Sequence, residues 1–397
     1  MARKIEELPE IDLNEAFSSG EAFDRVASAA HENGPFARSG RGLEVLGYQE
    51  SVALLRDRRL YSDHMGLVEA MQFPDGPAKE FKKNMLLSHG RDEYRTRIRQ
   101  ALTRVIGPNV IEEQRSAIRQ IANGLVGELD RGQEIDLLND YAFVIPARLF
   151  CSWFGAPVTD AKWVADVSDR ILRIFSNDPS QTSVIIEAYD ELFPYVERLI
   201  ANARAEPQDN LLGHFVREQE AGNLSEEELF HVGAMFNEAS TDNTANGIAT
   251  AIGLLLQERE RWQNVVEHPQ LIPVAIEESL RLSFRINTIV RYALEDLEFE
   301  GLSIPKGTPV FMLIPAAHRD PSVFENPLVY DLTRAPTRKL LDFGGGVYTC
   351  IGQRVATIEM EEAVNELVAN CPNAQLGAYG VDTNFFANTV SELKVSL

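Results

Sequence analysis

Hydrophobic positions recur at helical spacing along most of the chain, which predicts a mainly helical protein. The longest such stretch runs from Ser225 to Glu260 and opens with the capping box Ser225-Glu226-Glu227-Glu228. About 35 residues rising ~1.5 Å each would make one helix of about 50 Å, long enough to cross the whole protein. The other expected helices cover residues 14–31, 46–57, 92–106, 111–131, 160–175, 183–205, 212–221 and 351–370.

A different pattern follows Arg281. Short β-like runs lie between residues 288 and 314, with turns at Gly301 and at Pro305-Lys306-Gly307, and residues 316–345 are irregular and rich in proline. Short strands are expected to close the chain. No repeat or long linker separates these parts, so we expect one domain over residues 1–397, mainly α with a smaller β-rich part (an α+β fold).

Charge and composition narrow the function. The chain has 38 Lys and Arg against 60 Asp and Glu, a formal net charge of −22, which disfavours binding to nucleic acid or to an anionic membrane surface. No apolar run approaches the ~20 residues of a membrane span, and the N-terminal residues lack the apolar core of a signal peptide. We therefore expect a soluble cytoplasmic protein whose three cysteines, Cys151, Cys350 and Cys371, stay reduced.

One of these cysteines lies in the most informative segment, Phe343-Gly344-Gly345-Gly346-Val347-Tyr348-Thr349-Cys350-Ile351-Gly352. The three glycines allow a sharp turn and a close approach to a flat ligand. Cys350 directly precedes the helix expected from Ile351, where backbone N–H groups stabilise a thiolate. The segment therefore suits a soft metal ligand or a nucleophile, and the alternative is a buried structural cysteine beside an ordinary turn.

The spacing Phe-x-x-Gly-x-x-x-Cys-x-Gly resembles the haem-ligand loop of the cytochrome P450 family, and a chance match has a frequency of about 10⁻³ in a chain of this composition. The resemblance extends over about residues 15–397. It implies the cytochrome P450 fold, with the haem between the long helix and this loop. It also implies that Cys350 ligates the iron of haem b. The cofactor-binding residues implied in the loop are Phe343, Gly344, Tyr348, Cys350 and Gly352.

A second group of residues resembles the structural triad of the family. Glu278-Ser279-Leu280-Arg281 matches its Glu-x-x-Arg, and one helical turn brings the carboxylate and the guanidinium group together. His318-Arg319-Asp320-Pro321 then leads to Arg334, which would complete the triad. The resemblance assigns Glu278, Arg281 and Arg334 the bracing of the irregular segment that carries the cysteine loop.

The resemblance further implies that Arg95, Arg99, Arg291 and Tyr348 bind the haem propionates. Arg99 and Arg291 match arginines that the family often uses for this purpose. Arg95 replaces the usual His of a His-x-x-x-Arg pair, and Tyr348 replaces the usual His or Arg two residues before the cysteine. Both departures keep a hydrogen-bond donor, so we expect propionate binding to be redistributed rather than lost.

The long helix reads Ala239-Ser240-Thr241-Asp242-Asn243-Thr244-Ala245-Asn246 where the family has Ala/Gly-Gly-x-Asp/Glu-Thr. Asp242 would feed in, through water, the protons that the reduction of dioxygen needs. Asn243 takes the place of the usual Thr, and a frame shifted by one residue would put Thr244 there instead. Because an amide relays protons poorly, Asn243 is expected to orient an ordered water or the substrate. The alternative is that its side chain bonds the carbonyl four residues back and kinks the helix.

The resemblance also implies a substrate pocket with mostly apolar walls, which suits a small or medium hydrophobic molecule of terpenoid, steroid or aromatic type. Arg285 stands where the family commonly has Pro. It would anchor a substrate carboxylate, or else a haem propionate or a surface partner. The expected pocket residues are Phe236, Asn237, Ser240, Phe284, Arg285, Ile286, Asn287, Ile289, Phe385, Phe386 and Asn388.

The implied reaction is monooxygenation, with electrons from a separate ferredoxin or flavodoxin and its reductase. The basic residues that would dock such an acidic partner, unless they bind propionates or water, are Arg91, Arg95, Arg97, Arg99, Arg104, Arg338, Lys339 and Arg354. One alternative is a peroxide-driven haem-thiolate oxidase, which Asn243 permits and Asp242 opposes. The other is a non-catalytic haem- or ligand-binding protein.

Overall fold

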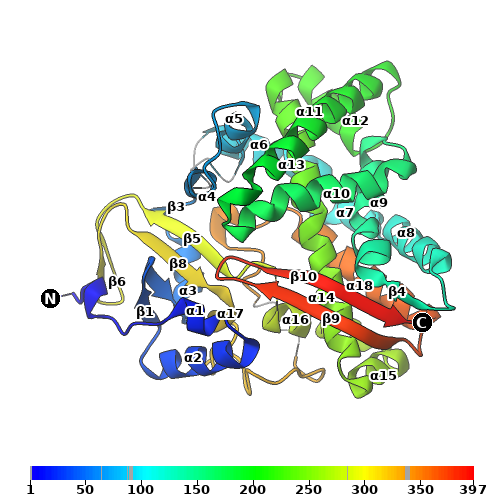
Figure 1. Cartoon of the computed structure of the whole chain (residues 1–397). Coiled ribbons are helices and arrows are strands. Elements are labelled where there is room, and N and C mark those ends of the chain that lie inside the picture. Colours follow the sequence, from blue (N-terminus) through cyan, green and yellow to red (C-terminus); the bar gives the residue numbers. More distant parts are fainter. Residues whose placement is uncertain (1, 64, 87, 89–92, 284, 336–339) are drawn as a thin grey trace. The chain divides into compact units, whose positions relative to one another are not determined.

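The computed structural model describes residues 2–63, 65–86, 88, 93–283, 285–335 and 340–397, with side chains for all of these except 108–110. The chain divides into two compact units. Unit 1 contains Met1–Asp63, Glu277–Cys350 and Val381–Thr389, and unit 2 contains His64–Ile276, Ile351–Gly380 and Val390–Leu397. Unit 1 has most of the strands and unit 2 most of the helices (Figure 1), which confirms the expected helix-rich fold with a smaller β-rich part.

Unit 1 is built on a five-stranded sheet in the order β1-β2-β8-β5-β3, in which β2 and β8 are parallel and the other neighbours antiparallel. Leu43, Val45, Val310 and Met312 of its strands are fully buried and pack with Leu54 in one hydrophobic core. The elements of unit 1 are η1 (Ile5–Glu7), α1 (Leu13–Ala16), α2 (Gly20–Glu32), β1 (Phe36–Ser39), β2 (Gly42–Val45), α3 (Tyr48–Arg56), β3 (Leu60–Tyr61), β5 (Thr288–Ala293), β6 (Leu297–Phe299), β7 (Leu302–Ile304), β8 (Pro309–Leu313), α17 (Ile314–Ala317) and η7 (Gly346–Tyr348).

Unit 2 is organised around α14, which contacts α9, α10, α13, α15 and α18 and has almost all of its side chains buried. Its helices are α4 (Met65–Ala70), α5 (Pro77–Lys83), α6 (Glu93–Ile106), α7 (Pro108–Glu113), α8 (Arg115–Glu128), η2 (Leu138–Ala142), α9 (Val144–Phe154), η3 (Val158–Asp160), α10 (Ala161–Leu172), η4 (Arg173–Ser176), η5 (Pro179–Gln181), α11 (Thr182–Ala205), α12 (Leu211–Glu220), α13 (Glu226–Ser240), α14 (Asp242–Leu256), α15 (Arg259–Glu267), η6 (Pro269–Leu271) and α18 (Gln353–Asn370).

Three elements cross from one unit to the other. Helix α16 (Ile272–Leu282) begins in unit 2 and ends in unit 1. Strands β9 (Gln375–Thr383) and β10 (Asn388–Ser396) form a three-stranded sheet with β4 (Glu134–Asp136), in the order β4-β10-β9. The tip of this hairpin, Val381–Thr389, belongs to unit 1.

Several expected helices are divided. Residues 14–31 form α1 and α2, with Ser19 capping α2 through its hydroxyl, and the region 111–131 is divided between α7 and α8 at Gln114. Helix α9 was not expected, because most of its residues are apolar and buried, which leaves a weak amphipathic pattern. None of the helices in the described ranges is both long and apolar enough to cross a membrane.

The single helix expected from Ser225 to Glu260 is wrong, although its capping box is confirmed by the Ser225 N–H, which donates to Glu228 Oε2 at 2.7 Å. The chain breaks at Thr241 between α13 and α14. There the buried hydroxyl of Ser168 on α10 donates to the Asn237 carbonyl at 3.2 Å and accepts from the Asp242 N–H at 3.3 Å. A side chain inserted into the backbone ladder is a recognised cause of a helix break.

Candidate functional site

The cysteine loop runs from Phe343 to Cys350 and closes on itself. The N–H of Cys350 donates to the carbonyl of Phe343 at 2.8 Å, and the hydroxyl of Thr349 donates to the carbonyl of Gly346 at 2.8 Å. The chain then enters α18 at Gln353, two residues later than expected. These bonds fix the backbone at Cys350, the last residue of the loop.

Glycine is required in this loop for two different reasons. Gly344 and Gly346 have φ angles of +72° and +65°, which residues with a side chain rarely adopt. A Cβ on Gly345 would lie 2.9 Å from the Cβ of Leu55, and a Cβ on Gly346 would lie 2.7 Å from the Leu55 carbonyl oxygen. The loop is therefore pressed against the end of α3, and the expected sharp turn is present.

The three cysteines differ in exposure. Cys350 is exposed, whereas Cys151 and Cys371 are buried. Burial raises the pKa of the Cys151 thiol to about 12 and also raises the pKa of Cys371, so both stay protonated and unreactive at neutral pH. Of the three, only Cys350 is exposed, so it is the one accessible to a ligand.

The structure brings Glu278, Arg281 and Arg334 together as a buried brace. Arg281 donates to both carboxylate oxygens of Glu278, at 2.8 and 2.9 Å, and Arg334 Nε donates to Oε1 at 2.9 Å. The N–H of Asp331 donates to Oε2 at 3.0 Å. Glu278 and Arg281 are 2% and 1% exposed, so each charge depends on the other for compensation.

The brace continues through hydrogen bonds towards the cysteine loop. Arg281 donates to the carbonyl of His318 at 3.1 Å, and the His318 ring nitrogen Nε2 accepts the N–H of Leu341 at 2.9 Å. Burial lowers the pKa of His318 to about 3, with a further contribution from nearby Arg281, so the ring is neutral and able to accept. Leu341 lies two residues before Phe343, so the brace fixes the start of the loop.

The residues expected to bind propionates form two groups. In unit 1, the buried guanidinium group of Arg291 lies 4.5 Å from the ring centroid of Tyr348 and donates to the carbonyl of Val290 at 2.8 Å. In unit 2, Arg95 and Arg99 lie one turn apart on α6. Arg95 is buried and donates to the carbonyl of Leu86, and Arg99 is half-buried.

The residues expected to relay protons lie directly after the break between α13 and α14. Asp242 is the first residue of α14 and is 1% exposed, and Thr244 is also buried. The side-chain oxygen of Asn243 is buried and accepts no hydrogen bond from the described part of the chain. Within the described residues the Asn243 amide nitrogen, which would be the donor, makes no bond to the carbonyl four residues back, so that alternative is wrong; such bonds are made by Ser240 and Asn246.

Polar residues expected in the substrate pocket of unit 1 bond to one another. The side-chain amides of Asn287 and Asn388 exchange hydrogen bonds of 2.9 and 3.1 Å. Arg285 is 4% exposed and donates to the carbonyl of Asn388 at 2.9 Å and to the hydroxyl of Thr389. The surface role suggested for Arg285 is therefore wrong, because these contacts hold the tip of the β9–β10 hairpin.

The apolar residues of the expected pocket have different surroundings. Phe386 lies in the hairpin tip beside Phe385, with ring centroids 4.6 Å apart, and Ile286 forms an isolated bridge with Ala387. Ile289 packs on the core of unit 1. Phe284 lies outside the described residues.

In unit 2, the expected pocket residues belong to α13. The ring of Phe236 packs between Phe154 and Phe215, with centroids 5.6 and 5.5 Å away, so it contributes to the helical core. Asn237 donates to the carbonyl of Val164 at 3.3 Å, and Ser240 donates to the carbonyl of Phe236 at 2.5 Å.

The basic surface expected on α6 is largely neutralised within unit 2. Arg97 donates to both oxygens of Glu228, and Arg104 pairs with Glu218. Arg95 is buried, and Arg354 donates to Glu112 at 3.0 Å. Three of these four arginines are paired with local carboxylates and one is buried, and docking of an acidic partner on them stays a prediction. Arg91, Arg338 and Lys339 lie outside the described residues.

Two clusters of buried polar residues were not predicted from the sequence pattern. In unit 2, Lys82 of α5 donates to Glu238 Oε1 and the hydroxyl of Tyr189 donates to Glu238 Oε2 at 2.7 Å. In unit 1, Glu44 is fully buried and is bonded by Arg41 and Ser39. The group in unit 2 joins residues too far apart for a sequence pattern, and the group in unit 1 has the spacing and composition of an ordinary turn.

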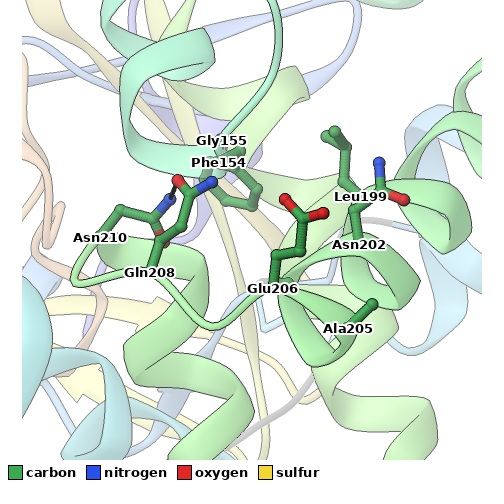
Figure 2. A pocket seen from close by; sticks show the side chains of 9 residues that line it. Phe154, Gly155, Leu199, Asn202, Ala205, Glu206, Gln208 and Asn210 are labelled. Carbon is green, nitrogen blue, oxygen red and sulfur yellow. Dashed lines mark hydrogen bonds between the residues drawn. The ribbon is translucent and has the colours of Figure 1, made fainter.

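A separate pocket of about 270 Å³ lies in unit 2, where α9 and α11 end and α12 begins (Figure 2). Figure 2 shows the side chains of Gln208 and Asn210 joined by their hydrogen bond, which is 3.1 Å long. The pocket contains none of the residues predicted from the sequence. Its lining residues are Phe154, Gly155, Leu199, Asn202, Ala203, Ala205, Glu206, Gln208 and Asn210.

Known proteins resemble this chain in sequence and structure. Residues 263–372 match the profile of the cytochrome P450 family. Luteothin monooxygenase of Streptomyces thioluteus is 31% identical over 373 residues, which cover 93% of this chain and 91% of that protein. The polyketide biosynthesis cytochrome P450 PksS of Bacillus subtilis is 28% identical over 362 residues, which cover 89% of this chain and 88% of that protein.

Among solved structures, a myxobacterial cytochrome P450 in complex with myristic acid has a TM-score of 0.83 and 25% identity, covering 97% of this chain and 99% of that one. This structural similarity shows the fold, and the 31% identity to luteothin monooxygenase over 93% of this chain shows the family. The chain therefore belongs to the cytochrome P450 family and is an oxidoreductase of the monooxygenase class.

Proposed function

We propose that Cys350 ligates the iron of haem b and that the chain oxidises a hydrophobic molecule of polyketide or acyl-chain type. The exposed thiol of Cys350 on its glycine-shaped loop carries the proposal. Two relatives support the substrate class, since one is named for polyketide biosynthesis and the other holds myristic acid. The terpenoid, steroid and aromatic types and the cytoplasmic location stay predictions.

The donor groups of the chain fit a haem. A thiolate is a suitable ligand for iron, and when bound the haem supplies the chemistry that activates dioxygen, with electron density from the sulfur. Arg291 with Tyr348 in unit 1, and Arg95 with Arg99 in unit 2, offer charged and neutral donors for the propionates. We assign them this role within one domain over residues 1–397, which the coverage of the relatives supports.

The residues at the helix break would control the delivery of protons. Asp242 is the buried carboxyl group that we assign to proton entry. The oxygen of Asn243, which accepts no hydrogen bond within the described residues, would hold an ordered water. The amide orients this water but does not itself exchange a proton readily.

Electrons would come from a separate ferredoxin or flavodoxin with its reductase. Membership of the family supports such a partner. A peroxide-driven reaction is the competing function.

The test is to purify the protein with haem, reduce it under carbon monoxide, and record the absorption band that distinguishes thiolate from imidazole ligation. We expect the thiolate band, and turnover of a myristoyl ester with reduced ferredoxin and dioxygen. Turnover with hydrogen peroxide but not with ferredoxin would favour the competing function. An imidazole-type spectrum would contradict the assignment of Cys350.

Substitution of Asn243 tests the water. We expect Asn243→Ala to lower the yield of product per electron pair about tenfold, the effect of one hydrogen bond of about 1.4 kcal/mol, while substrate binding changes little. Asn243→Thr restores a hydroxyl and is expected to couple at least as well as the native chain. The measurement is product formed against reductant consumed. If Thr244→Ala uncouples the reaction and Asn243→Ala does not, the frame shifted by one residue is correct.

A further inference from the structure

The strongest unexplained feature of unit 1 is the pair of half-buried Arg41 and fully buried Glu44. Glu44 lies in β2, opposite Phe311 of β8, and is fully buried. Arg41, in the turn between β1 and β2, donates through Nε to Oε1 at 2.7 Å and through Nη2 to Oε2 at 2.9 Å. The hydroxyl of Ser39 also donates to Oε1, at 2.6 Å. The carboxylate is therefore fully satisfied, and the pair is electrically neutral.

The third nitrogen of the guanidinium group is not satisfied. Nη1 of Arg41 is buried and makes no hydrogen bond with the described part of the chain, although Nη2 also donates to Thr288 Oγ1 at 3.0 Å. A buried donor without an acceptor costs about 1–3 kcal/mol, so a native structure is expected to supply an acceptor. Nη1 carries two N–H groups and cannot lose its charge.

Aromatic rings surround this donor. The guanidinium carbon lies 4.3 Å from the ring centroid of Phe311, 5.2 Å from that of Phe385 and 6.0 Å from that of Phe386. Thr288 fixes the hairpin tip by donating to the Phe385 carbonyl at 2.5 Å, and the amides of Asn287 and Asn388 hold the same tip. The donor thus stands among apolar side chains that the fold positions rigidly.

We propose that Arg41 Nη1 binds a neutral oxygen acceptor of the substrate, a ketone, ester or lactone carbonyl, beside Phe311, Phe385 and Phe386. The inference rests on the proposed function, because the hairpin tip and residues 285–289 are the segments that the family resemblance assigns to the substrate pocket. Arg41 thereby takes the place of Arg285 as the polar anchor of the substrate, because Arg285 donates to Asn388 and Thr389.

Charge decides between a carbonyl and a carboxylate. Glu44 already neutralises Arg41 from the other side of the guanidinium group, and its negative charge lies within a few ångströms of Nη1. A second carboxylate in this low-dielectric site would be repelled by Glu44 and would lose its hydration. A neutral carbonyl avoids both costs and still accepts a charge-assisted hydrogen bond.

The experiment uses the haem-loaded full chain and four probes titrated by the spin-state shift of the ferric haem and by calorimetry. The probes are cyclododecanone, cyclododecane, methyl dodecanoate and dodecanoic acid. We expect the native chain to bind the ketone at least about tenfold more tightly than the cycloalkane, and the ester more tightly than the acid. Arg41→Lys keeps a cation for Glu44 but removes Nη1, and should abolish the preference for the ketone.

Two further variants sharpen the test. Arg59→Lys is the matched control, because the half-buried Arg59 makes the same bidentate pair with Asp57. This variant should leave every binding preference unchanged. Glu44→Gln keeps an acceptor for Arg41 but removes the negative charge. The affinity for dodecanoic acid should therefore rise about tenfold relative to the affinity for its ester.

The inference is overturned if no carbonyl probe binds the native chain better than its hydrocarbon partner, as when only a water fills the site. It is also overturned if the acid binds better than the ester before Glu44 is changed. Failure of the proposed function has a different signature, because the native chain would then lack the thiolate spectrum altogether.

Discussion

Cys350→Ser is expected to abolish ferredoxin-dependent turnover while the chain stays folded. A hydroxyl does not ionise at neutral pH, so it cannot supply the thiolate that ligates iron and donates electron density to it. Because the Cys350 side chain is exposed, its replacement should change the free energy of unfolding of the haem-free chain by no more than about 0.5 kcal/mol. The measurements are the spectrum of the reduced carbon monoxide complex, product formation, and urea unfolding.

Cys371→Ala is the control, because it removes the buried thiol of the residue that follows α18 in unit 2. It should keep the thiolate spectrum and the activity, at the cost of some packing energy. If Cys350→Ser retained the thiolate band, another sulfur would be the ligand and the assignment of the loop would fail.

The sequence predicted those features whose partners lie close along the chain. Ser225 and Glu228 form the expected capping box, and Glu278 meets Arg281 one helical turn away. The sharp turn of the glycine loop was predicted for the same reason, since the positive φ angles at Gly344 and Gly346 are a local requirement. In each case the interaction depends on spacing within one element or one turn.

Features that depend on distant partners were missed. The helix break at Thr241 is made by Ser168, which lies 69 residues before the Asn237 carbonyl that it bonds. Arg41 meets Thr288 across 247 residues, and nothing in the pattern of the first strands indicates this contact. Two arginines of α6 pair with Glu218 and Glu228, which lie far from α6 in sequence. Charge along a helix shows which residues are charged but not which of them remain free.

Glu278→Gln is expected to lower the free energy of unfolding by about 3–5 kcal/mol. The change leaves the guanidinium group of Arg281 buried without a countercharge and turns an amide N–H₂ towards donors. For a protein whose whole stability is about 5–15 kcal/mol, this is a large fraction, and weaker haem retention should accompany it because the brace leads to Leu341. Urea unfolding followed by circular dichroism gives the energy. Glu298→Gln, the same change at an exposed position of β6, should alter it by no more than about 0.5 kcal/mol.

The double variant Glu278→Gln/Arg281→Met separates a brace from an isolated ion pair. Replacing both members of an isolated buried pair by neutral groups often restores stability. Here Arg281 also donates to the carbonyls of His318, Pro327 and Val329, at 3.1, 2.5 and 2.9 Å. The double variant leaves these carbonyls without their donor, at about 1–3 kcal/mol for each one that stays unsatisfied, so it should be no more stable than Glu278→Gln. Recovery to the native value would mean that the carbonyls find other donors and that Arg281 does not organise the segment leading to the cysteine loop.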